Sequence, residues 1–171
     1  MTTSDSPKAP EAVVINTGPI VALCVAGVAS IVGRLPLKFL APPEVAAEIA
    51  AGRQLGHPVA MPEWVAVTPL DQPVGALGQS TLDAGEAAVI ELALQRRIAL
   101  VAIDEARGRR AASAAGLTVI GSLGLLGRAK AQALIPAVGP YVAAMRAGGV
   151  YLDTALVQRF LMAVGEPAPG A

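Results

Sequence analysis

The sequence is poor in the residues that carry sulfur, imidazole and aromatic chemistry. Its 171 residues include one cysteine, Cys24, and one histidine, His57. A single cysteine excludes a disulfide within the chain and a zinc site made of several cysteines. His57 lies in a loop-like stretch beside a glycine and a proline, which disfavours the oriented geometry of a Ser-His-Asp triad. Because the neighbours of Cys24 are apolar, we expect its thiol to serve as a small buried apolar group.

The chain also lacks an excess of charge of either sign. Thirteen basic residues balance thirteen acidic residues, and only three of the basic residues are lysines. No global positive field therefore draws nucleic acid to the protein, and contact with nucleic acid would need a local basic patch. Five aromatic residues are scattered along the chain, so a platform for base stacking is not evident.

We expect no secretory signal at the start of this sequence. Residues 1–11 are polar and lack a basic start followed by an apolar run, so we expect a disordered tail there. Residues 13–33 carry no charge and are long enough to span a bilayer, but Asn16, Gly18 and Pro19 interrupt them early. Buried parallel strands also read as apolar runs. We expect a cytoplasmic protein without a membrane segment, and keep a membrane-associated protein as a remote alternative.

Short apolar runs alternate with helical patterns along the rest of the chain. Strands are expected at residues 12–15, 37–40, 99–103 and 117–120, with a short strand or extended segment at 64–67. Helices are expected at residues 20–25, 29–32, 44–51, 83–95, 105–115, 122–131, 136–147 and 153–164, and a loop at 71–80. This alternation predicts one three-layer α/β/α domain with a parallel central sheet, at residues 12–166, before a flexible tail at 167–171.

Polar side chains follow the predicted strands where ligands collect in parallel sheets. Asn16 follows the first strand, Asp104 and Glu105 follow the third long strand, and Glu48 lies on the helix after the second. Asp83 and Glu86 open another helix. If these groups converge, their mutual repulsion is relieved by a hard cation such as Mg²⁺, which prefers oxygen ligands. Such a site suits phosphodiester hydrolysis.

Each of these residues also has an ordinary structural interpretation. Asp83 and Glu86 have the spacing of a capping box, and Asp104 could cap the helix that starts after it. Asn16 suits a strand-to-turn junction, and Glu48 suits a solvated helix face. Capping and metal binding are compatible, because a cap fixes the orientation of the same carboxylate.

Basic side chains follow the predicted acidic cluster. Arg107, Arg109 and Arg110 lie on the helix after Asp104, and Arg128 and Lys130 lie on the next helix. Arginine forks of this kind hold phosphates, although an exposed or salt-bridged face is the ordinary alternative.

The order of four sequence blocks resembles the PIN-like proteins, and in particular a prokaryotic branch related to toxin–antitoxin ribonucleases. The blocks are Val-Ile-Asn-Thr-Gly-Pro at residues 14–19, Pro-Pro-Glu-Val at 42–45 continuing to Glu48, Leu-Asp-Ala-Gly-Glu-Ala at 82–87, and Ile-Asp-Glu-Ala-Arg-Gly-Arg-Arg at 103–110. Residues 119–126 and 149–153 also match that branch. The resemblance covers nearly the whole chain, from about residue 13 to residue 166.

This resemblance implies a metal-dependent ribonuclease site. Carried over by position, it assigns catalysis to Asn16, Glu48, Glu86 and Asp104, and metal binding to Glu48, Asp83, Glu86, Asp104 and Glu105, with Mg²⁺ or Mn²⁺ as cofactor. Thr17, Arg107, Arg109 and Arg110 would contact RNA. It further implies a toxin with a small antitoxin partner and a homodimer.

One departure from the family pattern leaves two hypotheses open. Asn16 occupies a position where a family nuclease presents aspartate, and its neutral amide oxygen is a weaker Mg²⁺ ligand. The first hypothesis is a Mg²⁺-dependent endoribonuclease. The second is a catalytically weakened PIN-like scaffold that binds protein or RNA.

Overall fold

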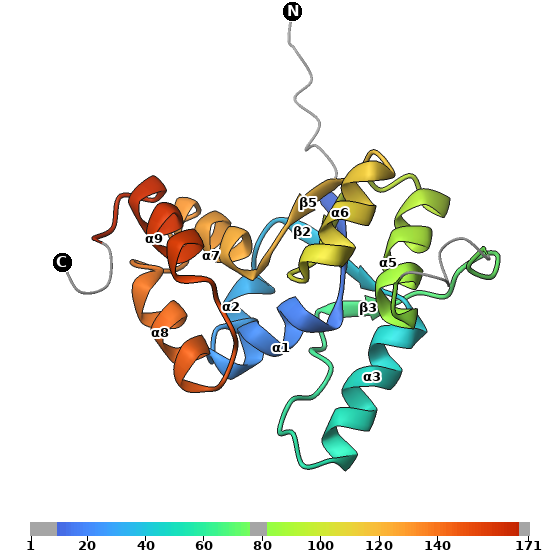
Figure 1. Ribbon diagram of the computed structural model, residues 1–171, viewed down its shortest axis with the longest axis horizontal. Coiled ribbons are helices and arrows are strands. Elements are labelled where there is room, and N and C mark those ends of the chain that lie inside the picture. The colour runs from blue at the N-terminus through green and yellow to red at the C-terminus, as the bar shows by residue number, and fades with distance from the viewer. Residues whose placement is uncertain (1–9, 76–81, 168–171) are drawn as a thin grey trace, which may run out of the picture.

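A five-stranded parallel sheet forms the centre of the molecule in a computed structural model, which describes residues 10–75 and 82–167 (Figure 1). The strands are β1 (Glu11–Ile15), β2 (Leu37–Ala41), β3 (Val65–Val67), β4 (Leu100–Ala102) and β5 (Thr118–Ile120). Their order across the sheet is β3-β2-β1-β4-β5, so β1 is central. The predicted parallel α/β sheet is confirmed.

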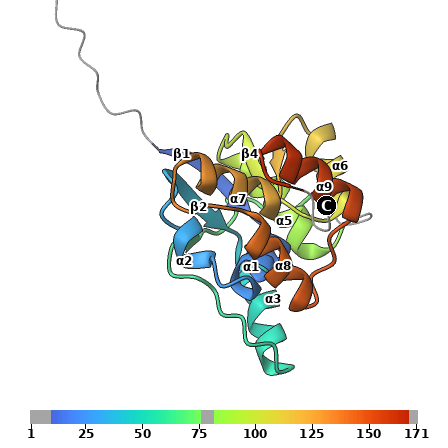
Figure 2. The ribbon, with the colours of Figure 1, turned by 90° about the vertical axis from the view of Figure 1, so that its left-hand side faces the viewer.

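Helices cover both faces of this sheet. They are α1 (Thr17–Val25), α2 (Ala29–Val32), α3 (Pro43–Gln54), α5 (Ala84–Gln95), α6 (Ala106–Ala114), α7 (Ser122–Ala131), α8 (Gly139–Ala147) and α9 (Thr154–Ala163). Helices α1, α2, α7 and α8 gather on one side, with α9 beyond them, and α5 and α6 lie on the other side (Figures 1 and 2). Helix α3 contacts both α1 and α5 and projects away from the sheet.

The central strands are apolar because both of their faces are buried. Val13, Val14 and Ile15 have no exposed surface, and neither do Val101 and Ala102 of β4. Residues 13–33, which raised the question of a membrane segment, are divided among β1, α1, α2 and their connections. In the part of the chain that the structure describes, no helix has both the length and the apolar character needed to cross a bilayer.

The start of β1 differs by one residue from the expected boundary of the N-terminal tail. Strand β1 begins at Glu11, whose carboxylate pairs with Arg128 Nη1 at 2.7 Å, so the expected tail at residues 1–11 ends one residue too late. The predicted boundary is wrong by this one residue because Glu11, although charged, still pairs with Leu37 of β2. Residues 1–9 and 168–171 of the two expected tails, and residues 76–80 of the expected loop, lie outside the described ranges.

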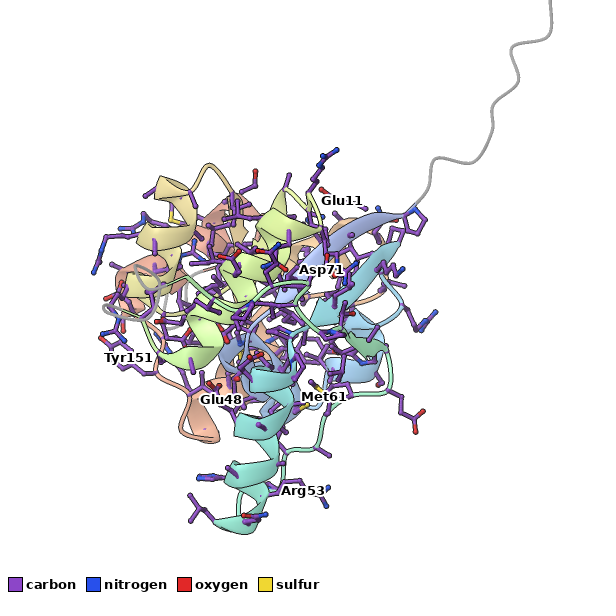
Figure 3. The ribbon with its side chains drawn as sticks, turned by 90° about the vertical axis from the view of Figure 1, so that its right-hand side faces the viewer. Glu11, Glu48, Arg53, Met61, Asp71 and Tyr151 are labelled. Atoms are coloured by element: carbon purple, nitrogen blue, oxygen red, sulfur yellow. The ribbon has the colours of Figure 1, made fainter. Side chains whose placement is uncertain are left out.

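The strand register aligns the polar residues that follow the central strands. Ile15 of β1 pairs with Ala102 of β4, and Val14 pairs with Leu40 of β2. The residues after these three strands therefore start from one edge of the sheet, which we call the carboxyl edge. Figure 3 shows Glu11 at the start of β1 and Glu48 on α3, well separated from each other.

Candidate functional site

Asn16 lies at the carboxyl edge between β1 and α1. Its backbone N–H donates to the carbonyl oxygen of Ala102 at 2.9 Å, which fixes the residue beside β4. The side chain is 3% exposed, and its Oδ1 has no hydrogen-bond partner among the described residues. The amide does not cap α1. A buried acceptor without a donor costs free energy, so this oxygen would gain from a ligand that it can bind.

Glu86 is the most deeply buried carboxylate of the site. It is 1% exposed and forms a capping box at the start of α5. Its N–H donates to Asp83 Oδ1 at 2.7 Å, and the Asp83 N–H donates to Glu86 Oε2 at 3.4 Å. Burial raises the pKa of Glu86, and the negative charge of Asp83 raises it further. The cap therefore fixes a carboxylate whose charged form is costly without a nearby cation.

A close backbone approach makes room for Glu86. A Cβ added at Gly108 of α6 would lie 2.7 Å from Glu86 Oε1 and 3.0 Å from Ile103 Cγ2. Glycine in a helix interior costs about 1 kcal/mol relative to alanine, so its presence here indicates a steric requirement. Gly108 thus lets α6 pack directly against the carboxylate of Glu86.

Glu48 is held at the site by the first residue of α1. The hydroxyl of Thr17 donates a short hydrogen bond to Glu48 Oε2. The Glu48 side chain is half-buried and packs on Gly85, where an added Cβ would lie 2.9 Å from Glu48 Cδ. It projects from α3 beside the start of α5 (Figure 3). The alternative of a solvated helix face is therefore wrong for Glu48.

Glu105 contacts α1 at the carboxyl edge. Its carboxylate lies over Gly18 of α1, where an added Cβ would be 2.5 Å from Glu105 Oε1. Its negative charge is also one of the causes that raise the pKa of Glu86. Thr17 and Gly18 thus join Glu48 on one side to Glu105 on the other. We call Asn16, Thr17, Glu48, Glu86 and Glu105 the acidic site.

Asp104 makes a different set of contacts. Its Oδ1 accepts the backbone N–H of Ser122 at 2.8 Å, at the start of α7. Burial raises the pKa of Asp104, while hydrogen bonds from Ser122 and the charge of Arg109 partly oppose the rise. The expectation that Asp104 caps the helix after it is wrong, because Glu105 occupies that cap position and Asp104 bonds to the next helix. Its role in catalysis stays a prediction.

The basic residues divide between the site and the rest of the fold. Arg107 Nη2 lies 3.7 Å from Glu86 Oε2 and is largely exposed. Arg109 instead donates to the carbonyl oxygen of Ile103 at 2.7 Å, and Arg110 is exposed on α6. Arg128 and Lys130 do not flank the acidic site, because they pair with Glu11 and Glu166, respectively. Among the described residues, Arg107 is thus the arginine that pairs with an acidic-site carboxylate.

The donors of the acidic site fit a hard cation by chemical type. Every candidate is an oxygen, and one of them, Asn16 Oδ1, is buried without a partner in the described structure. Within residues 10–75 and 82–167, no group of three carboxylates, imidazoles or thiols is already arranged to hold a metal ion. Glu48 and Glu86 are instead hydrogen-bonded to protein groups, so binding would exchange some of those bonds for the metal.

The strand-end pattern predicted most of these residues, but it did not predict the glycines between them. Gly18, Gly85 and Gly108 each leave space for one carboxylate of the acidic site. For Gly85 and Gly108 the signal in the sequence was a glycine inside a predicted helix, since such a glycine needs a packing or functional reason; Gly18 lies before the first predicted helix and gave no such signal. Only the structure shows which side chain occupies the space.

Parallel strands covered by helices, with acidic groups at their carboxyl edge, define an α/β/α protein with a candidate cation site. A family model for the PIN domain matches residues 12–166 of the chain. The protein belongs to this family. Comparison with curated proteins found no match, and comparison with solved structures found none either.

Proposed function

We propose that the protein is a Mg²⁺-dependent endoribonuclease that hydrolyses RNA phosphodiester bonds. The observation that supports this proposal most strongly is the buried, unpartnered Asn16 Oδ1 next to strand β4, in a site where Glu86 is 1% exposed. A protein gains no stability from either feature alone. Both become favourable when a dication is bound, and the PIN-domain fold is of a nuclease type.

Each residue of the acidic site has a distinct proposed role. Glu86 and Glu105 supply negative charge for Mg²⁺ or Mn²⁺, Glu48 adds a third carboxylate, and Asn16 adds a neutral oxygen. Bound Mg²⁺ would supply positive charge to the phosphodiester. Asp83 fixes Glu86 through the capping box and is exposed at the rim. The hydroxyl of Thr17 orients Glu48 and lies close enough to the site to contact a phosphate oxygen.

Asp104 and the arginines are proposed to position the site and its substrate. Asp104 accepts a hydrogen bond from the first turn of α7. Arg109 donates a hydrogen bond to the carbonyl of Ile103, the residue before Asp104. Arg107 and Arg110 are exposed on α6, and we propose that both reach the RNA backbone as phosphate ligands, Arg107 by exchanging its ion pair with Glu86 for a phosphate. Since the net charge of the chain is zero, these two residues would provide the local positive patch.

The resemblance to toxin–antitoxin ribonucleases supports a cellular setting for this activity. We propose a toxin that acts in the cytoplasm as a homodimer and is inhibited by a small antitoxin. Size-exclusion chromatography with light scattering tests the dimer, and a monomer at micromolar concentration would remove that part of the proposal. Growth arrest on expression, relieved by a neighbouring small gene, tests the toxin.

Cleavage of a single-stranded RNA by purified protein tests the enzymatic proposal. We expect cleavage with Mg²⁺ or Mn²⁺ that EDTA abolishes. Glu105→Gln and Glu86→Gln should each lower kcat by at least about 100-fold, while Asp104→Asn should lower it less if Asp104 only positions α7. Cleavage that survives EDTA and Glu86→Gln would remove the proposal.

A second candidate, a weakened scaffold that binds RNA or protein, is favoured by one specific observation. Asn16 contributes no charge, and the described residues include no carboxylate group already arranged around a metal. Asn16→Asp separates the two candidates. Strong metal-dependent cleavage that appears only in this variant would favour the scaffold, and efficient cleavage by the wild type would remove it.

A further inference from the structure

A cavity of about 580 Å³ opens beside the acidic site. It lies between the first turns of α3 and α5 and residues 69–74, which follow β3. Asp83, whose side chain caps α5 together with Glu86, also lines this cavity. The volume falls within the range of about 300–1,000 Å³ that is typical of small-molecule sites. The cavity is therefore large enough for a small molecule and is linked to the acidic site through Asp83.

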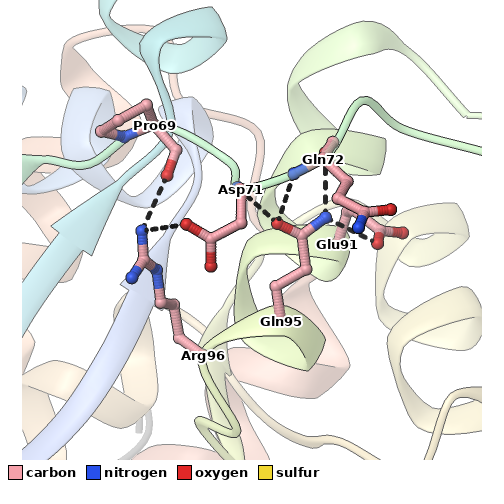
Figure 4. Close-up of polar contacts among 6 residues, drawn as sticks. All are labelled: Pro69, Asp71, Gln72, Glu91, Gln95 and Arg96. Carbon is pink, nitrogen blue, oxygen red and sulfur yellow. Dashed lines mark hydrogen bonds and ion pairs between the residues drawn. The ribbon is translucent and has the colours of Figure 1, made fainter.

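One wall of the cavity is fixed by hydrogen bonds from the end of α5. Gln95 Oε1 accepts the backbone N–H groups of Asp71 and Gln72 at 2.7 and 3.2 Å, and Gln95 Nε2 donates to the Gln72 carbonyl at 2.9 Å. Arg96 pairs with Asp71 at 2.9 Å and donates to the carbonyl of Pro69 (Figure 4). Residues 69–72 are thus held in place without a ligand, which reduces the ordering cost of binding.

The lining of the cavity excludes a phosphate and favours a neutral planar group. Apolar surface comes from three prolines and five aliphatic residues, namely Pro43, Pro69, Pro73, Leu70, Val74, Leu82, Ala84 and Ala87. The charged residues of the lining are Glu44, Asp71 and Asp83, and no arginine or lysine of the described chain lines it. A phosphate would meet only negative charge there. A base would fit, since flipped-out bases are held between apolar side chains and read by hydrogen bonds.

Glu44 supplies the acceptor that selects the base. Its side chain is half-buried in the first turn of α3, and its Oε2 is shielded and without a hydrogen-bond partner in the described structure. The proposed contact therefore requires the half-buried Glu44 side chain to rotate so that both carboxylate oxygens face the cavity. An unsatisfied carboxylate binds most strongly to a ligand with N–H donors.

We propose that this cavity binds a guanine base of the RNA substrate through Glu44. Guanine presents two neighbouring donors, N1–H and the N2 amino group, which match the two oxygens of one carboxylate. Adenine and cytosine offer a single amino group on the corresponding edge, and uracil places carbonyl oxygens on both sides of its one N–H. RNA as the source of the guanine rests on the proposed nuclease function, whereas recognition of the base does not.

Binding of nucleosides to metal-free protein tests this proposal without any cleavage. Titrations followed by NMR in EDTA should show that guanosine binds at least about tenfold more tightly than inosine, which lacks the N2 amino group, and more tightly than uridine. Glu44→Gln should remove this preference. Equal binding of guanosine and uridine, or guanosine binding that is unchanged in Glu44→Gln, would overturn the proposal.

Two further variants keep the test specific. Glu63→Gln removes the same charge from an exposed position outside the cavity and should leave guanosine binding unchanged. Ala84→Phe fills the cavity from an exposed position that lines it and should abolish binding while Glu44 stays intact. Guanosine binding that survives Ala84→Phe would place the base elsewhere and overturn the proposal.

The source of the guanine is tested separately. A short single-stranded RNA with one guanine should bind more tightly than guanosine, because the acidic site lies beside the cavity. An RNA that binds no better than guanosine would overturn the RNA part of the inference. Cleavage of RNA without any guanine preference would overturn base recognition and leave the nuclease proposal intact. Guanosine binding by a protein that never cleaves RNA would overturn the nuclease proposal and leave base recognition intact.

Discussion

At the scale of single residues, the acidic site combines groups that are unfavourable without a ligand. Glu86 is buried among other acids, and burial is the main cause of its raised pKa. Asn16 carries an unpaired buried oxygen. Buried carboxylates with shifted pKa values are common at functional sites, because the bound ligand compensates the cost of burying the charge. Two predictions follow from the charge of these residues.

The first prediction concerns the proton on Glu86. A raised pKa means that the folded chain binds this proton more tightly than the unfolded chain, so the free energy of unfolding falls as pH rises from the ordinary glutamate pKa through the raised value. Glutamine cannot ionise, and it still accepts the Asp83 N–H. In EDTA, Glu86→Gln should therefore be more stable than the wild type at pH 7, and equally stable below the ordinary pKa.

Urea unfolding at a series of pH values measures this difference. Glu63→Gln, at an exposed position, is the matched control and should show no such pH dependence. A Glu86→Gln variant that is less stable than the wild type at pH 7 would show that the ion pair with Arg107 outweighs the cost of burial.

The second prediction concerns the neutral residue of the site. Asn16→Asp places a negative charge in a buried position at the carboxyl edge, so without metal it should lower the free energy of unfolding by about 2 kcal/mol. Millimolar Mg²⁺ should restore most of this loss. Thermal unfolding with and without Mg²⁺ checks the prediction against Gln132→Glu, an exposed control. An Asn16→Asp variant that gains no more from Mg²⁺ than the wild type would contradict it.

At the scale of helices and strands, close packing of α6 against α5 depends on one glycine. Alanine at Gly108 would gain about 1 kcal/mol of helix propensity, but its Cβ would press on Glu86 Oε1 and Ile103 Cγ2. Overpacking costs about 1–3 kcal/mol, and Glu86 is fixed by its capping box. We predict a net loss of about 1 kcal/mol for Gly108→Ala, measured by denaturant unfolding.

A second helical glycine provides the control for this prediction. At Gly52 of α3 an added Cβ would make only ordinary contacts with His57, at 3.7 Å and beyond. Gly52→Ala should therefore raise the free energy of unfolding by about 0.5–1 kcal/mol. If both variants change stability in the same direction, the steric role of Gly108 is wrong.

One carboxylate links the end of α9 to α7 and to the start of α8. Glu166 accepts hydrogen bonds from Lys130 Nζ and from the backbone N–H groups of Val138 and Gly139, all between 2.7 and 2.8 Å. Burial alone would raise its pKa, but these three donors lower it overall. One side chain thus satisfies the start of α8 and holds the end of α9 against α7.

Removal of this carboxylate should loosen α8 and α9. We predict that Glu166→Ala lowers the free energy of unfolding by about 2 kcal/mol at pH 7. Because the folded pKa is lowered, the contribution of Glu166 is present above the ordinary pKa and is lost as pH falls through the folded value. Denaturant unfolding at pH 7 and at acid pH measures this loss, with the exposed Glu63→Ala as control. A difference that stays constant down to acid pH would contradict the account.

At the scale of the whole molecule, the sequence predicts the architecture better than it predicts the site. The alternation of apolar runs and helical patterns determines which segments become strands, because buried strands such as residues 13–15 need unbroken apolar side chains. The same pattern does not determine side-chain direction. Asp104 and Glu105 are adjacent in sequence, yet one bonds Ser122 and the other lies over Gly18.

The cavity beside the acidic site was beyond sequence reasoning for a related reason. Its walls come from three separate segments, and Gln95 fixes one of them through backbone atoms that carry no sequence signal. Glu44 resembles any acidic residue in the first turn of a helix. Its unpaired oxygen becomes visible only when all surrounding groups are placed.

Binding of Mn²⁺ to the purified protein, followed by electron paramagnetic resonance, tests the central claim most directly. The acidic site predicts saturable binding that Mg²⁺ displaces, weakened by at least about tenfold in Glu86→Gln and unchanged in Glu63→Gln. A wild-type protein that binds no Mn²⁺ at millimolar concentration, or a Glu86→Gln variant that binds it as tightly as the wild type, would contradict this account.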